Sequence, residues 1–246
     1  MSEQHDPKVA LVVGAGDATG GAVARRFARE GYITCITRRN ADKLKPLVDE
    51  IEAEGGIVHA FGSDARKEDA VAELVADIER HMGPIDVAVY NIGANVNFPI
   101  SETTSRVYYK VWEMACFGAF LMGREVAKRM IPRGRGTIIF TGATASVMGR
   151  TGFAAFASAK FAKRGLAQSM ARELGPKGIH VAHVIIDGPI DTAFIRENMQ
   201  HMLAERDYDD NMLQPNDIAE IYWNLHNQPR STWSFEMDLR PWAEPW

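Results

Sequence analysis

The chain has 246 residues, of which 46% are hydrophobic and 24% are charged, and its formal net charge is −4. These values are typical of a globular protein, and the length fits one large α/β domain. A net negative charge lacks the basic excess that nucleic-acid binding requires, so no nucleic-acid partner is expected.

The longest apolar runs are only as long as strands, and the first residues are polar. Neither a membrane span nor a signal peptide is therefore predicted, and we expect a cytoplasmic protein. Cys35 and Cys116 are too few for a metal framework or a disulfide scaffold, so both are expected to be buried thiols. His180 and His183 would point to opposite faces of one strand, and without a third ligand no metal site is predicted.

Short apolar runs alternate with amphipathic stretches along the whole chain. The expected strands cover 8–13, 33–37, 57–61, 85–90, 137–141, 179–186 and, near the end, 233–237. The expected helices cover 22–30, 41–54, 67–81, 103–129 (closed by Pro132), 153–174, 194–204 and 217–225. Such alternation predicts a single doubly wound parallel sheet covered by helices on both faces, a three-layer sandwich. We expect one domain over 1–246, with the polar segment 190–215 as a lid over a ligand cleft.

A glycine-rich turn with Gly14, Gly16 and Gly20 separates the first strand from the first helix. Glycine there lets the backbone approach a pyrophosphate, and the helix N-terminus supplies N–H donors. The turn therefore favours dinucleotide binding, although a tight structural turn is the alternative.

Two arginines, Arg38 and Arg39, follow the second strand, where a carboxylate would bind the ribose 2′-hydroxyl of NAD. Guanidinium groups suit a 2′-phosphate, so NADP(H) is preferred over NAD(H). Asp17 in the glycine turn argues mildly against this preference, and a solvated surface pair is the alternative role for the arginines.

Phe156 lies four residues before Lys160 in the predicted helix 153–174, so the two side chains share one helix face. A tyrosine in place of Phe156 could donate a proton to a carbonyl, with the lysine lowering its pKa. Here the lysine is present and the phenol is absent.

These motifs, in this order, resemble the short-chain dehydrogenase/reductase family, which implies a Rossmann-type fold and an NAD(P)-dependent oxidoreductase. The resemblance runs from about residue 8 to 192 and more loosely to the C-terminus. It implies cofactor-binding roles for a set of residues spread along the chain: Gly14, Gly16, Gly20, Asp64, Ala65, Asn91, Gly93, Lys160, Gly188, Ile190 and Thr192.

The family's catalytic set is Asn, Ser, Tyr and Lys, and the resemblance aligns these with Ala115, Ala143, Phe156 and Lys160. Only Lys160 keeps the family residue, which implies an atypical site. Another proton donor could be Thr144 or Ser146, although a loop hydroxyl is the ordinary role of each.

Asp187 stands where the family usually has proline, and it is either a further acid or a turn former. A substrate that needs no acid from the enzyme, such as an iminium or a conjugated acceptor, is a further possibility.

The first functional hypothesis is an atypical NADP(H)-dependent oxidoreductase acting on a small apolar carbonyl or related electrophile. The alternative is a non-catalytic nucleotide-binding regulator or partner subunit on the same scaffold. Lyase activity is disfavoured, because it commonly needs the Ser and Tyr as well. The family resemblance also implies a homodimer or homotetramer.

Overall fold

The computed structural model describes residues 7–198 and 212–244 and contains one seven-stranded sheet, in the order β3-β2-β1-β4-β5-β6-β7. Every neighbouring pair is parallel. The strands are β1 Val9–Val13, β2 Ile33–Arg38, β3 Ile57–Gly62, β4 Ile85–Tyr90, β5 Gly136–Thr141, β6 Ile179–Ile186 and β7 Glu236–Leu239. The predicted parallel sheet is confirmed, but the last strand starts three residues later than the sequence indicated.

The helices are α1 Thr19–Arg29, α2 Lys45–Ala53, α3 Glu68–His81, α4 Ser105–Trp112, α5 Gly118–Arg133, α6 Ala154–Leu174, α7 Ala193–Asn198 and α9 Pro215–His226. The predicted helix 41–54 opens with a 3-10 turn, Ala41–Leu44, before α2. The predicted helix 194–204 is described only as far as α7, and its remainder lies outside the described residues.

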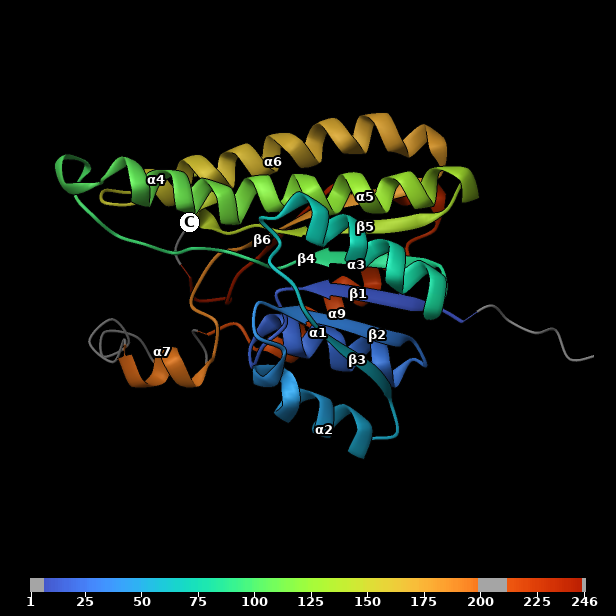
Figure 1. Cartoon of the computed structure of the whole chain (residues 1–246). Coiled ribbons are helices and arrows are strands. Elements are labelled where there is room, and N and C mark those ends of the chain that lie inside the picture. Colours follow the sequence, from blue (N-terminus) through green and yellow to red (C-terminus); the bar gives the residue numbers. More distant parts are fainter. Residues whose placement is uncertain (1–6, 199–211, 245–246) are drawn as a thin grey trace, which may run out of the picture.

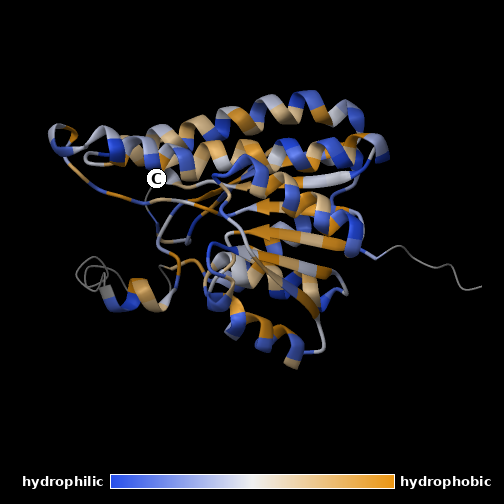
Figure 2. Cartoon of the chain, in the orientation of Figure 1, coloured by the Kyte–Doolittle hydropathy of each residue, from blue (hydrophilic) through white to orange (hydrophobic). Residues whose placement is uncertain are grey.

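Helices cover both faces of the sheet, as predicted for a doubly wound fold (Figure 1). One buried cluster joins the sheet to α3, α5 and α6, and the other joins it to α1, α2 and α9. Figure 2 shows the strands as a largely hydrophobic layer between helices of mixed character. This pattern follows from burial on both faces, which requires apolar side chains on both sides of the central strands. No described helix has both the length and the apolar character needed to cross a bilayer.

The predicted helix 103–129 is correct in type but wrong in its regularity and its end. A π-helical segment, Glu113–Phe117, separates α4 from α5. The Tyr90 hydroxyl donates to the Met114 carbonyl at 2.6 Å, within that segment, so the irregular backbone has a buried partner. Pro132 lies inside the last turn of α5 rather than closing it, and the helix ends at Arg133, capped by Gly134, which is left-handed with φ of 62°.

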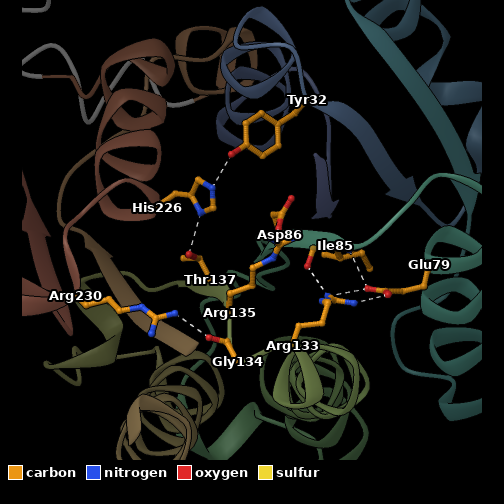
Figure 3. A network of polar contacts seen from close by, with 10 residues as sticks. All are labelled: Tyr32, Glu79, Ile85, Asp86, Arg133, Gly134, Arg135, Thr137, His226 and Arg230. Atoms are coloured by element: carbon orange, nitrogen blue, oxygen red, sulfur yellow. Dashed lines mark hydrogen bonds and ion pairs between the residues drawn. The ribbon is translucent and has the colours of Figure 1, made fainter. Parts of the chain in front are cut away.

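A polar network lies at the amino ends of the strands (Figure 3). His226 bonds the Tyr32 hydroxyl at 2.8 Å and the Thr137 hydroxyl at 2.9 Å, which ties α9 to the residue before β2 and to β5. Burial lowers the pKa of His226 to about 4. Arg133 pairs with Glu79 at 2.6 Å and so joins α5 to α3. Side-chain contacts thus connect the elements at the amino ends of the strands. The carboxyl ends of the strands are the side where a ligand can bind.

Candidate active site

A cavity of about 580 Å³ opens at the carboxyl ends of the strands. It extends from β1 and β4, where the strand order reverses, to β5 and β6, as expected for ligand sites in doubly wound sheets. The predicted residues in its lining are Asn91, Gly93, Ala143, Thr144, Phe156, Lys160, Gly188, Ile190 and Thr192. The other predicted residues stand outside that lining: Gly14, Gly16, Gly20, Arg38, Arg39, Asp64, Ala65, Ala115 and Ser146.

The glycine turn is fixed against the two neighbouring strands. Gly14 has φ of 90°, which favours glycine, and its amide donates to the Thr37 carbonyl at 3.2 Å. The Asn91 side chain donates to the Gly14 carbonyl at 3.1 Å. A Cβ on Gly20 would stand 2.5 Å from that same carbonyl oxygen, so the turn admits no side chain there.

The N-terminus of α1 follows this turn and fits a phosphate group. No side chain caps its first amides, and Ala18 and Thr19 line the cavity. The Thr19 hydroxyl is buried and has no hydrogen-bond partner among the described residues. An anion at this end of the helix would satisfy both the amides and the hydroxyl. The residues present therefore fit the pyrophosphate of a dinucleotide.

Arg38 and Arg39 stand at the end of β2, and both are exposed. The Arg38 guanidinium would lie 3.9 Å from a Cβ built on Gly16, so it borders the glycine turn. Within the described ranges no carboxylate forms an ion pair with either arginine. Asp64 makes no hydrogen bond to them, because Arg66 binds its two oxygens at 2.8 and 2.6 Å; Arg66, with a smaller contribution from the Arg39 charge, holds the pKa of Asp64 at about 2.

Lys160 is the charged group deepest in the cavity, with 4% of its surface exposed. Its ammonium donates to the carbonyls of Thr141 at 3.1 Å and Gly142 at 3.3 Å. The ammonium also stands 5.4 Å from the centre of the Phe156 ring, one turn earlier on α6. Burial lowers the pKa of Lys160 to about 8. The pair predicted from the sequence is therefore assembled, with an apolar ring beside the amine.

A second lysine on the same helix face was missed by the sequence reasoning. Lys163 is fully buried, hydrogen-bonded to Lys160, and within 3.5 Å of the Ile92 carbonyl. Burial and the neighbouring Lys160 charge hold its pKa well below the usual range. The three-residue spacing from Lys160 could have identified it, because such residues share a helix face.

The two hydroxyls considered as alternative acids have different surroundings. Thr144 lines the cavity and donates its proton to Asp187 at 2.5 Å. Ser146 is fully buried outside the lining, and its oxygen accepts the Ala143 amide at 3.1 Å. Arg240 pairs with Asp187 at 2.9 Å, so Asp187 joins the loop after β5 to the residues after β7. No local pattern in the sequence could have indicated this contact.

The remaining predicted positions lie at the edges of the cavity or outside its lining. Ala115 is fully buried in the π-helical segment, beside the carbonyl that Tyr90 engages. Gly188 has φ of 143° after β6, and Ile190 bridges to Leu213 across the ends of the predicted lid. Residues 199–211 of that lid lie outside the described residues. The described parts of the chain contain no group of three or more His, Cys, Asp or Glu side chains that could hold a metal.

Comparison with known proteins gives consistent matches over most of the chain. Residues 8–203 match the model of the short chain dehydrogenase family. The gluconate 5-dehydrogenase of Gluconobacter oxydans is 32% identical over 82% of this chain and 77% of its own length. The 2,3-dihydro-2,3-dihydroxybenzoate dehydrogenase of Bacillus subtilis is 32% identical over 75% of this chain and 70% of its own.

Solved structures agree with these matches. A short-chain dehydrogenase from Rhodopseudomonas palustris is 48% identical, with a TM-score of 0.81 over 96% of this chain and 99% of its own. A metagenomic short-chain oxidoreductase in complex with NADP is 26% identical, with a TM-score of 0.81 over 95% of this chain and 96% of its own. The fold and strand order of the present chain, together with these matches, show that it belongs to the short-chain dehydrogenase/reductase family of oxidoreductases.

Proposed function

We propose that this protein is an atypical NADP(H)-dependent oxidoreductase that transfers hydride to or from a small apolar carbonyl or a related electrophile. One observation carries the proposal: a single cavity joins the uncapped N-terminus of α1 to Lys160. The first fits a phosphate group, and the second is a buried cation suited to the oxygen of a reacting carbonyl.

The preference for NADP(H) rests on Arg38 and Arg39. Both are exposed at the end of β2, and Arg38 borders the glycine turn, so their guanidinium groups could bind a 2′-phosphate. The metagenomic relative was solved with NADP, which is in line with this choice.

The bound cofactor would supply or accept the hydride, and the residues of this chain would do the rest. The Lys160 ammonium would stabilise negative charge on the reacting oxygen. Phe153 and Phe156 line the cavity beside Lys160 and favour an apolar substrate. Because Phe156, Ala143 and Ala115 offer no proton, the transition state lacks a few kcal/mol of stabilisation, a rate factor of about 10² to 10⁴.

The test is an equilibrium titration of the protein with NADPH and NADH, followed by a turnover screen of aldehydes, ketones, imines and enones. We expect tighter binding of NADPH than of NADH. Changing Arg38 and Arg39 together to alanine should weaken NADPH binding by about tenfold or more and leave NADH binding unchanged. The matched control is Arg129→Ala, an exposed arginine of α5 that lies outside the cavity lining.

The alternative proposal is a nucleotide-binding regulator or partner subunit, favoured by the three apolar side chains where the family has Asn, Ser and Tyr. Such a protein would bind the cofactor tightly and turn over no substrate in the same screen. Absence of binding to either nucleotide would contradict both proposals.

We also propose that the protein forms a homodimer or homotetramer through α4, α5 and α6. These helices carry exposed aromatic side chains: Tyr108, Tyr109, Phe120 and Phe161, with 43%, 58%, 37% and 43% of their surfaces exposed. Apolar patches of this kind often mark contacts between subunits. Light scattering of the purified protein would decide this, and Phe161→Glu should shift the population toward monomer.

A further inference from the structure

We infer that Thr144 and Asp187 form a proton relay that serves the oxidation of an alcohol. This inference rests on the proposed function and narrows its reacting pair to an alcohol and the matching carbonyl compound. It also supplies a proton path that makes no use of the Phe156 position.

The relay begins with the hydroxyl of Thr144. Thr144 lies in the turn Thr144–Ser146 directly after β5, and its side chain lines the cavity together with Lys160. Its proton is given to Oδ1 of Asp187 at 2.5 Å. A hydroxyl has one proton and two lone pairs, so the Thr144 oxygen can only accept a hydrogen bond from a ligand in the cavity. An alcohol has a proton to donate there, whereas a carbonyl has none.

Asp187 lies behind Thr144 and does not line the cavity. Its second oxygen, Oδ2, pairs with the Arg240 guanidinium at 2.9 Å, so the two carboxylate oxygens have different partners. Because Arg240 engages Oδ2, the lone pairs of Oδ1 stay available to take up the proton of the Thr144 hydroxyl. The Asp187 side chain keeps 13% of its surface exposed, so the proton can pass on to water.

The reaction balances in one turnover. The alcohol's C–H bond would break, and the bound cofactor in its oxidised form would accept the electron pair as hydride. The O–H proton passes to the Thr144 oxygen while the Thr144 proton passes to Asp187, and the substrate's C=O bond forms. The Lys160 ammonium stabilises the charge on the substrate oxygen during the transfer. The products are a carbonyl compound, the reduced cofactor and a protonated Asp187, which then releases its proton to water.

The test uses the full chain with NADP⁺ and a panel of small secondary alcohols, and with NADPH and the matching ketones. Thr144→Val and Asp187→Asn should each lower kcat for oxidation by about 100-fold or more and leave NADP⁺ affinity unchanged. Thr144→Ser should keep the activity within about tenfold, because it retains the hydroxyl. The matched control is Asp238→Asn, because Asp238 shares Arg240 at 2.9 Å but has no contact with Thr144.

The pH profile separates a relay from a structural contact. Asparagine at 187 can still accept the Thr144 proton in a hydrogen bond, so the geometry persists while the base is lost. Below pH 8, where Lys160 keeps its proton, the residual oxidation rate of Asp187→Asn should rise with pH more steeply than the wild-type rate, because hydroxide replaces the carboxylate. If wild type oxidises an alcohol and Thr144→Val and Asp187→Asn do so at the same rate, the relay is overturned and the proposed function stands. Absence of wild-type turnover would overturn the proposed function, and the relay with it.

Discussion

Replacing Lys163 by methionine should stabilise the protein, and the gain should shrink as pH rises. The Lys163 side chain is fully buried, and its amine has a 3.5 Å contact with the Ile92 carbonyl and a hydrogen bond to Lys160. Methionine fills a similar volume with no polar atom to desolvate. The substitution therefore removes the amine and keeps the packing.

The upper limit of the gain follows from the unfolded chain, because burial and the Lys160 charge lower the pKa of Lys163 in the folded protein. In the unfolded chain a lysine has a pKa of about 10.4, so holding it neutral at pH 7 costs at most about 4 to 5 kcal/mol. The two hydrogen bonds return about 1 to 2 kcal/mol of this. The variant should thus gain up to about 3 kcal/mol at pH 7. Because the unfolded state binds the extra proton, wild-type stability rises with pH, and the gain should fall by up to about 1.4 kcal/mol per pH unit toward pH 9.

The assay is equilibrium urea unfolding of wild type and Lys163→Met at pH 7, 8 and 9, at one protein concentration. Lys43→Met is the matched control, because Lys43 is an exposed lysine in the 3-10 turn Ala41–Leu44, away from the proposed subunit contact. It should change stability by less than about 0.5 kcal/mol at every pH. Equal pH slopes for wild type and Lys163→Met, or a destabilised variant at pH 7, would refute the reasoning.

Three further outcomes are expected. Burial holds the pKa of His226 at about 4, whereas a histidine in the unfolded chain has a pKa of about 6.5. The free energy of unfolding should therefore fall by about 3 kcal/mol as pH drops from 6.5 to 4, because the unfolded state binds the extra proton. Acid unfolding of His226→Gln should not show this loss. Gly20→Ala should weaken NADPH binding at least about tenfold, measured by nucleotide fluorescence, because its Cβ would stand 2.5 Å from a carbonyl oxygen. Phe156→Tyr with Ala143→Ser and Ala115→Asn should raise ketone reduction by about 10² to 10⁴, and no gain in a folded, cofactor-bound triple variant would contradict the assigned positions.

Local patterns were sufficient to predict the sheet, because each strand is a short apolar run bounded by turn residues. They could not place the π-helical segment, since its cause is the contact between Tyr90 and Met114 across two elements. The same limit applies to the site. Phe156 and Lys160 are neighbours on one helix and were paired correctly, whereas Thr144 and Asp187 are 43 residues apart and meet only because β5 and β6 are adjacent.

The polar network around His226 and the cavity around Lys160 stand at opposite ends of the same strands. Substitutions in the network should change the acidity or temperature at which the chain unfolds without altering the reaction, and substitutions in the cavity should do the reverse. Resistance to acid and heat and substrate specificity can therefore be selected independently in this protein. A library confined to the loops after the strands would explore new substrates while the opposite end keeps the fold intact.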